Sequence, residues 1–359
     1  MSETATSTAP AEHSPAAATA PATQEMPLAR AINLGLRHAM EADPAVMLMG
    51  EDIATLGGVF RVTDGLLDDF GGDRVVDTPL AESGIVGTAI GLAMAGYRPV
   101  CEIQFDGFVF PAFDQITTQL AKISYRSRGR LNVPVVIRIP YGGGIGAIEH
   151  HSESPEALFA HTPGLRVITP ATAGDAYTMI QEAIACPDPV IFLEPKARYW
   201  EKGPVPLNDP ARPTAPQGAP GFDAGAVQRA RVVREGTDIT LAGYGPTMRT
   251  LVAAAQAAAE EGTSAEVIDL RSVSPLDVDT VAASVRKTGR LVVAHEAPTY
   301  FGAGAELAAS ISAECFYHLQ APVLRVGGFH TPYPVAAIEE DYLPDLDRVL
   351  HAIDTSLAH

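Results

Sequence analysis

One stretch of the chain reads Asp77-Thr78-Pro79-Leu80-Ala81-Glu82-Ser83-Gly84-Ile85-Val86-Gly87-Thr88-Ala89-Ile90-Gly91-Leu92-Ala93-Met94-Ala95-Gly96. It predicts a helix of small and apolar residues that begins beside a single carboxylate, Glu82. Glycine lowers the stability of a helix interior, so a helix this rich in glycine is favoured where another backbone or a ligand approaches closely. On spacing alone, Glu82 is a first-turn carboxylate that the helix dipole favours. The rest of the chain decides whether it also has a chemical role.

Composition and charge bound the class of protein. With 359 residues, 47% of them hydrophobic, the chain is long enough for two domains that each have a core. The formal net charge of −18 argues against nucleic acid and against anionic membrane surfaces, and leaves basic proteins as partners. The cysteines Cys101, Cys186 and Cys315 lie far apart and form no CxxC pair, so no disulfide framework or thiolate zinc site is expected. These features favour a reducing, cytoplasmic location.

Residues 1–25 differ in composition from the rest of the chain. They are rich in Ala, Thr, Pro and Ser and contain no Lys or Arg, which predicts a disordered tail. Their acidic residues Glu3, Glu12 and Glu25 are unlike those of a signal or transit peptide. No apolar run in the sequence reaches the length of a membrane span.

Strand and helix patterns alternate from residue 28 to residue 193. Apolar residues at four-residue steps over 28–40 predict a helix, and the β-branched run 134–139 predicts a strand covered on both faces. We also expect strands at 46–49, 74–76, 99–105, 165–168 and 190–193, and helices at 64–70, 112–125, from Ser154, and at 173–185. The alternation predicts a parallel α/β sheet whose ligands lie beyond the carboxyl ends of the strands. The glycine run at 141–146 is expected to be mobile or wrapped around a ligand.

A second alternation follows a proline-rich segment. Strands are expected at 239–242, 265–270, 291–294 and 323–326, and helices at 247–261, 277–287, 303–319 and 346–357. Repeated prolines make the segment before them a stiff linker. We therefore predict two three-layer α/β domains with mostly parallel sheets. Their boundaries are a tail at 1–25, a first domain at 26–203, a linker at 204–228 and a second domain at 229–359.

Besides Glu82, three sets of residues could carry chemistry, and each has an ordinary structural explanation. Aromatic residues spaced as here are usually core, yet these follow a strand end where a flat ligand could stack: Phe105, Phe108, Phe110 and Phe113. A loop histidine is usually just solvated, but His150 and His151 precede a helix and could hydrogen-bond an anion. The helix end at 183–188 has carbonyls that could hold a cation, although water or the next turn is their usual partner. The GxGxxG, Walker and GxSxG motifs are absent.

Together, the motifs of this chain resemble those of the β subunit of 2-oxo acid dehydrogenase E1 components, a family similar to transketolase in fold. They extend over nearly the whole chain, from about Pro27 to Ala352. The matching runs are Gly50-Glu51-Asp52, Gly57-Gly58-Val59-Phe60-Arg61-Val62-Thr63, 77–91, Glu102-Ile103-Gln104-Phe105, Pro111-Ala112-Phe113-Asp114-Gln115, His151-Ser152-Glu153-Ser154-Pro155-Glu156, Glu194-Pro195-Lys196 and Val267-Ile268-Asp269-Leu270-Arg271.

The resemblance implies a fold and an assembly. The first domain would bind the aminopyrimidine of thiamine diphosphate, and the second, similar to the transketolase C-terminal domain, would support assembly. In this family a GDG…N motif on a separate α subunit holds the diphosphate and its Mg²⁺, and no GDG occurs here. The chain therefore looks like half of an active site, which an E1 α subunit completes in an α2β2 heterotetramer. A single-chain transketolase would carry both halves.

Three residues acquire roles from this resemblance. Glu82 matches the carboxylate that hydrogen-bonds the aminopyrimidine and so activates the cofactor, whose thiazolium ring is the electron sink for decarboxylation. Phe108 matches an aromatic residue that packs on the aminopyrimidine. His151 matches a histidine that binds the substrate carboxylate or takes part in acyl transfer to lipoamide. The neighbouring His150 leaves open which ring faces the site, and we favour His151.

Relatives also bind K⁺ through backbone carbonyls. The corresponding positions here are Val135, Ala183, Cys186 and Asp188, with Cys186 and Asp188 in place of the usual Asp and Asn. A second departure is the run at 296–302, where relatives tend to have Arg-Thr-Gly-Gly-Phe-Gly; it concerns partner contacts more than chemistry.

The implied activity is oxidative decarboxylation of a 2-oxo acid with acyl transfer to the lipoyl domain of the E2 core. The contexts of Gln104-Phe105 and of residues 151–156 look most like the branched-chain type, which acts on 3-methyl-2-oxobutanoate, with pyruvate as the alternative substrate. A non-catalytic scaffold that docks E2 is an alternative of another class, against which the presence of Glu82, Phe108 and His151 together argues. The acidic charge predicts that the second domain meets a basic subunit-binding domain of E2.

Overall fold

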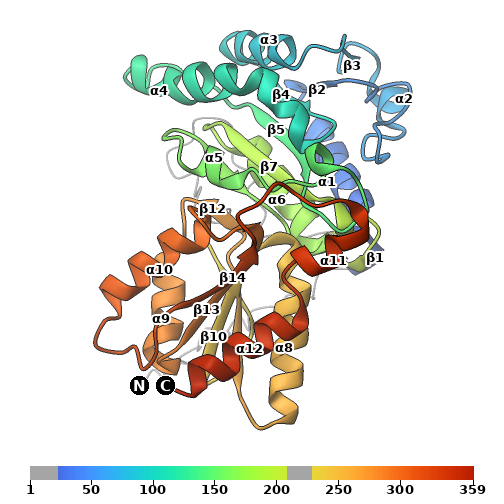
Figure 1. Ribbon diagram of the computed structural model, residues 1–359. Coiled ribbons are helices and arrows are strands. Elements are labelled where there is room, and N and C mark those ends of the chain that lie inside the picture. Colours follow the sequence, from blue (N-terminus) through green and yellow to red (C-terminus); the bar gives the residue numbers. More distant parts are fainter. Residues whose placement is uncertain (1–22, 208–228) are drawn as a thin grey trace, which may run out of the picture.

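The computed structural model describes residues 23–207 and 229–359 and shows two α/β domains, one above the other in Figure 1. The first domain is built on a seven-stranded sheet with the strand order β12-β6-β7-β5-β4-β2-β3, and the second on a five-stranded sheet with the order β14-β13-β10-β11-β9. Most neighbouring strands pair in parallel, and β12 and β9 are the antiparallel exceptions in these two sheets. The predicted fold class is confirmed.

The first sheet lies between two layers of helices. Its strands are β2 (Val46–Gly50), β3 (Val75–Asp77), β4 (Arg98–Glu102), β5 (Val136–Tyr141), β6 (Arg166–Ile168), β7 (Val190–Pro195) and β12 (Ser272–Ser274). Its helices are α1 (Leu28–Ala42), α2 (Leu66–Phe70), α3 (Glu82–Met94), α4 (Ile123–Arg126), α5 (Glu156–Ala160) and α6 (Ala173–Ala185). Successive strand residues face opposite layers: Val136 of β5 packs in the cluster with α1 and α6, and Ile137 in the cluster with α3.

The second domain repeats this arrangement. Its strands are β9 (Arg231–Arg234), β10 (Ile239–Gly243), β11 (Ala265–Asp269), β13 (Leu291–Pro298) and β14 (Leu324–Gly328). Its helices are α8 (Met248–Glu260), α9 (Val278–Thr288), α10 (Ala303–Glu314), α11 (Glu339–Tyr342) and α12 (Leu346–Leu357). One core cluster includes buried residues of both domains, among them Ile139 of β5 and Tyr244. The two domains are therefore packed against each other rather than merely tethered.

Two described strands extend across predicted domain boundaries. Strand β1 (Thr23–Pro27) pairs antiparallel with β8 (Lys202–Pro206), so β1 includes residues of the predicted tail and β8 includes residues of the predicted linker. The ladder satisfies backbone groups on both segments, and Met26 and Val205 are buried beneath it. The rest of the predicted tail and linker lies outside the described residues.

The helix expected at 112–125 is not a regular α-helix. The structure has a 3₁₀ segment (Asp106–Ala112), a π-helical segment (Gln115–Gln119), another 3₁₀ turn (Leu120–Lys122) and only then α4. The reason is local: Pro111 cannot donate a backbone hydrogen bond, and the Thr117 hydroxyl donates to the Phe113 carbonyl at 2.8 Å. Helix α10 also ends earlier than expected, at Glu314.

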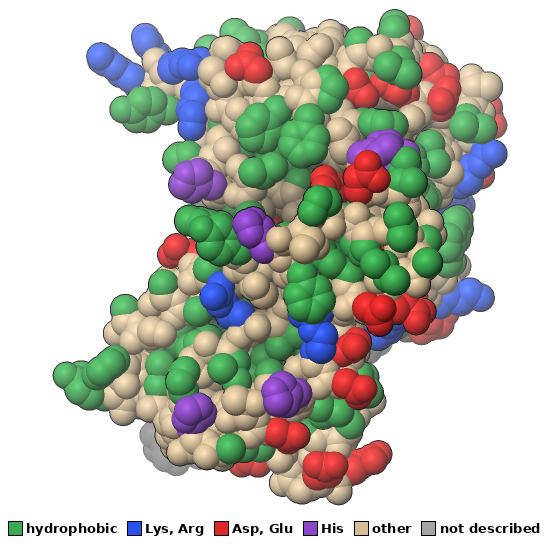
Figure 2. Space-filling model, in the orientation of Figure 1, with side chains coloured by type: hydrophobic (Ala, Val, Ile, Leu, Met, Phe, Trp, Pro, Cys, Tyr) green, Lys and Arg blue, Asp and Glu red, His purple; other side chains and the backbone are tan. Residues whose placement is uncertain are grey.

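Charge is unevenly distributed on the surface. Figure 2 shows acidic side chains dispersed over both domains, and one group of Lys and Arg side chains at the end of the first domain that carries α4. Arg126, Arg128 and Arg130 are exposed there. Within residues 23–207 and 229–359, no helix has the length and apolar character that crossing a membrane requires.

Candidate active site

The candidate site lies where three neighbouring parallel strands end. Glu51 directly follows β2, Gln104 follows β4 after one residue, and Glu82 begins α3 after the turn that leaves β3. The Gln104 side-chain amide donates to the Glu51 carbonyl at 3.4 Å and to an Asp52 carboxylate oxygen at 3.3 Å. Because parallel strands end at one edge of a sheet, residues far apart in sequence meet here, as expected for an α/β protein.

Glu82 is a buried carboxylate with a second carboxylate as its neighbour. It lies at the N-terminus of α3, and both it and Glu51 are only 8% exposed. Burial raises the pKa of Glu51, and the nearby charge of Glu82 raises it further. Among the described residues, Oε1 of Glu51 is buried and has no hydrogen-bond partner. Since buried polar atoms are normally paired, this unpartnered oxygen beside Glu82 marks a place that suits a polar ligand with hydrogen-bond donors.

An aromatic cluster follows β4 and contains the predicted histidine. The His151 ring stacks on Phe105 with 3.9 Å between ring centroids, and Phe108 lies edge-on to His151 at 5.0 Å. Phe108 packs against the core cluster that includes Ile85 of α3. The structure thus brings Phe108 and His151 together, and the segment Asp106–Ala112, which carries Phe108, contacts the helix that begins at Glu82. The ring of His151 stacks on Phe105, whereas that of His150 lies 6.1 Å from Phe108, so which ring faces the site stays a prediction.

A buried ion pair anchors the histidine segment. The Lys196 ammonium donates to the Asp106 carboxylate and to the His151 backbone carbonyl, and the Glu153 backbone N–H donates to Asp106 Oδ2 at 2.9 Å. The two paired side chains are 2% and 1% exposed. Burial raises the pKa of Asp106 and lowers that of Lys196. Sequence reasoning gave neither residue a role; the available signal was the position of Lys196 directly after a strand, in the matching run Glu194-Pro195-Lys196.

The ion pair rests on a second buried network. Arg138 of β5 donates through Nε and Nη2 to the two oxygens of Glu194 at 2.6 and 3.0 Å, and through Nη1 to Glu102 at 2.7 Å. All three side chains are at most 5% exposed. A two-point arginine–carboxylate contact fixes geometry as well as charge. It therefore ties the middle of β5 to the carboxyl-terminal parts of β4 and β7.

The glycine-rich face of α3 is open in this chain. A Cβ atom built on Gly87 or Gly91 would meet nothing within 4 Å, and the same holds for Gly96 just after the helix. Leu80, just before the helix, is 82% exposed. The close approach predicted from the glycines is therefore not made by the described part of this chain, and it stays a prediction about a ligand or another subunit.

The four K⁺ positions lie at the opposite edge of the same sheet. Val135 precedes β5, and Ala183, Cys186 and Asp188 lie between the last turn of α6 and the start of β7. The carbonyls of Val135 and Ala183 accept backbone hydrogen bonds from Val190 and Cys186, which leaves each oxygen one lone pair. The Asp188 carboxylate accepts from Arg166 at 2.7 and 3.0 Å. These oxygen atoms could coordinate a cation only in part, because several of them already accept hydrogen bonds.

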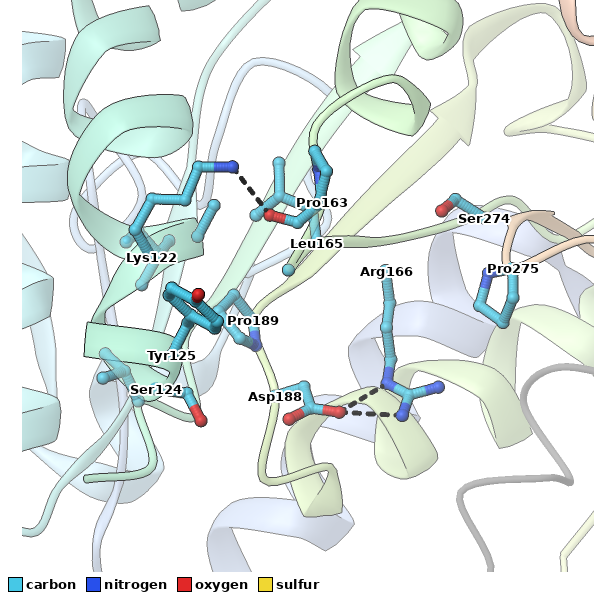
Figure 3. A pocket seen from close by; sticks show the side chains of 14 residues that line it. Lys122, Ser124, Tyr125, Pro163, Leu165, Arg166, Asp188, Pro189, Ser274 and Pro275 are labelled. Carbon is cyan, nitrogen blue, oxygen red and sulfur yellow. Dashed lines mark hydrogen bonds and ion pairs between the residues drawn. The ribbon is translucent and has the colours of Figure 1, made fainter. Parts of the chain in front are cut away.

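Asp188 also lines a cavity of about 750 Å³ (Figure 3). Its walls include Tyr125, Pro163, Arg166 and Pro275, and Figure 3 shows the Arg166–Asp188 pair on one side and the Lys122–Pro163 hydrogen bond on the other. Glu82, Phe108 and His151 do not line this cavity, nor the one beside Phe301 and His161. The predicted chemistry and this cavity are therefore at different edges of the sheet.

Comparisons with known proteins agree with this architecture. Residues 24–201 match the model of the transketolase pyrimidine-binding domain, and residues 228–349 match that of the transketolase C-terminal domain. A solved structure titled "Split gene transketolase, inactive beta4 tetramer" superimposes with a TM-score of 0.70 at 22% identity, covering 93% of this chain and 98% of that one. The fold and the strand-end site thus define a two-domain protein of the transketolase class.

Sequence relatives narrow the class to one family. The chain is 57% identical over 339 residues to the pyruvate dehydrogenase E1 component subunit beta of Leifsonia xyli, covering 94% of this chain and 97% of the relative. It is 53% identical over 336 residues to the 3-methyl-2-oxobutanoate dehydrogenase subunit beta of Mycobacterium tuberculosis, covering 93% of each. It is 44% identical to the 2-oxoisovalerate dehydrogenase subunit beta of Pseudomonas aeruginosa, covering 90% and 93%. The chain belongs to the family of E1 component β subunits of 2-oxo acid dehydrogenases.

Proposed function

We propose that this chain supplies the aminopyrimidine half of a thiamine diphosphate site in an α2β2 E1 2-oxo acid dehydrogenase. The observation that carries the proposal is the buried Glu82–Glu51 pair, with its unpartnered carboxyl oxygen, beside the Phe105–Phe108–His151 cluster. The partner α subunit would hold the diphosphate and most of the Mg²⁺ coordination, and the open glycine face of α3 offers a surface for it.

Each residue of the site has a distinct task in this proposal. Glu82 would share a proton with a ring nitrogen of the cofactor, and the Phe108 ring would provide an apolar surface for its aminopyrimidine. When bound, thiamine diphosphate supplies the electron sink for decarboxylation. His151 would bind the carboxylate of the 2-oxo acid or transfer a proton during acyl transfer to the E2 lipoyl domain. Its Nδ1–H donates to the His150 carbonyl at 2.8 Å, which leaves Nε2 free for this work.

Branched-chain 2-oxo acids are the substrates we propose first, with 3-methyl-2-oxobutanoate as the test compound. The relative from Mycobacterium tuberculosis carries that activity in its name, and the relative from Leifsonia xyli supports pyruvate as the second candidate. Comparing kcat/KM for the two acids on the purified α2β2 enzyme decides between them.

The cytoplasmic location and a K⁺ ion at Val135, Ala183, Cys186 and Asp188 remain predictions. The K⁺ ion is tested by replacing K⁺ with choline in activity and thermal-stability assays.

The substitution Glu82→Gln tests the proposal directly. It keeps the size of the side chain and removes its ability to share a proton, so we expect turnover to fall at least about 100-fold while the tetramer stays intact. Glu306→Gln is the matched control, because Glu306 is an exposed first-turn carboxylate of α10. Near-normal decarboxylation by the Glu82→Gln enzyme would refute the proposal and favour the alternative class, a scaffold subunit that only docks E2.

A further inference from the structure

Two carboxylates of the second domain are bound by the glycine loop of the first. The Gly143 N–H donates to Glu296 Oε2 at 3.0 Å. The N–H groups of Gly144 and Gly146 donate to the two oxygens of Glu339, each at 2.9 Å. The loop expected to be mobile or wrapped around a ligand is therefore wrapped around side chains of its own chain. We call Glu296 and Glu339 the carboxylate clamp.

The clamp explains why this loop consists of glycines. Gly142 and Gly144 have φ values of +82° and +84°, which L side chains rarely adopt. A Cβ atom on Gly143 would lie 1.8 Å from the Tyr333 hydroxyl, and one on Gly142 would lie 2.7 Å from Glu296 Oε2. Tyr333 in turn donates its hydroxyl to Glu339 Oε1 at 2.7 Å. Only a bare backbone can approach the second domain this closely, so loop and clamp form one fitted contact.

The clamped loop leads directly to His151. The Gly142 N–H donates to the Glu153 carbonyl at 3.0 Å, which closes residues 142–153 into a loop with joined ends. His151 is near one end of this loop, where its carbonyl accepts from Lys196 and its ring stacks on Phe105. The Lys196–Asp106 pair thus anchors one end of the loop, and the carboxylate clamp anchors the other.

We propose that Glu296 and Glu339 are positioning residues for His151. By holding residues 143–146 against the second domain, they restrict the conformations of the closed loop and keep the His151 ring over Phe105. The second domain thereby contributes to catalysis without touching substrate or cofactor. This inference rests on the role proposed above for His151, and it assigns Glu296 of the second domain a contact with the loop that carries His151.

The test uses Glu339→Gln in the assembled α2β2 enzyme. Both Glu339 oxygens accept hydrogen bonds, so the amide of Gln would place an N–H donor against a backbone N–H donor. Glu340→Gln is the matched control, because Glu340 is exposed on the same helix α11. We expect faster amide hydrogen exchange over residues 142–153 in Glu339→Gln alone. We also expect a loss of about tenfold in whichever kinetic parameter His151→Ala lowers, since hydrogen bonds to charged groups contribute on that scale.

A double-mutant comparison separates positioning from general support of the fold. If Glu339 acts through His151, adding Glu339→Gln to His151→Ala produces no further loss. Tyr333→Phe, which removes one donor to Glu339 and keeps the clamp carboxylates, should lower the same parameter by a smaller factor and serves if Glu339→Gln does not assemble. An additive loss in the double mutant overturns this inference while the role of His151 stands. Normal kinetics in both Glu339→Gln and Tyr333→Phe overturns it as well. Normal kinetics in His151→Ala overturns that role itself.

Discussion

The substitution Lys196→Met removes the cation that anchors the His151 segment and leaves Asp106 buried. Lys196 and Asp106 are 2% and 1% exposed, and their charges face each other in the protein interior. Breaking a buried pair by removing one partner costs about 3 to 5 kcal/mol, because the remaining charge loses its compensation. A domain of this size loses about 2 to 4 °C of melting temperature per kcal/mol, so we expect a decrease of about 6 to 20 °C.

Thermal unfolding of the α2β2 enzyme, followed by calorimetry, measures this effect. Lys122→Met is the control, because Lys122 donates only to the Pro163 carbonyl at 3.0 Å and is partly exposed. A single hydrogen bond of that kind contributes about 1 kcal/mol. The double substitution Lys196→Met/Asp106→Asn should recover much of the loss, since an Asn carbonyl can still accept from the Glu153 N–H and carries no charge.

Two results would refute this reasoning. If the free energy of unfolding falls by less than about 1 kcal/mol in Lys196→Met, the charge of Asp106 is already compensated by its neighbours. A double variant no more stable than Lys196→Met would show that the lost stability comes from the lysine stem rather than from an unpaired carboxylate.

Two further predictions concern pH and salt. Burial lowers the pKa of His295 from 6.5 to about 4. Between these pH values the folded state therefore binds fewer protons than the unfolded chain. The free energy of unfolding should fall by about 3 kcal/mol as the pH drops from 6.5 to 4. In His295→Gln, but not in the exposed-site control His351→Gln, this pH dependence should shrink. The free energy of unfolding is measured by urea titration at several pH values. If its change with pH is the same in His295→Gln as in the unmodified chain, His295 is not its cause. If the acidic second domain meets a basic E2 subunit-binding domain, E1–E2 affinity should weaken as NaCl rises from 50 to about 500 mM, and titration calorimetry showing a salt-independent affinity would exclude electrostatic docking.

The candidate site could be predicted in part because its chemistry is marked locally. Glu82 stands out as the one carboxylate at the start of a glycine-rich helix, and His151 stands out through the residues that follow it. Glu51 and Lys196 belong to matching runs but were given no role. The unpartnered oxygen of Glu51 and the burial of Lys196 depend on neighbours from other strands, which a linear pattern does not report.

Local departures from the predicted elements have equally specific causes. The segment 112–125 has the apolar spacing of a helix, yet Pro111 and Thr117 divide it into 3₁₀, π and α turns. Strand β1 was missed because isolated residues 23–27 have no apolar pattern of their own. They form a strand only because β8, far away in sequence, offers an unpaired edge.

The sequence by itself determined the α/β class and most of the order of strands and helices, because these follow from short-range periodicity. Residue type made Glu82 and the His150–His151 pair candidates, and the resemblance to E1 β subunits selected Glu82 and His151. Only the tertiary structure decided what holds His151 in place. The glycine loop at 141–146 is equally compatible with mobility, a ligand or a protein contact until Glu296 and Glu339 are brought to it from the second domain. Backbone N–H groups bind any suitably placed anion, so the identity of that anion depends on chain packing rather than on the loop sequence.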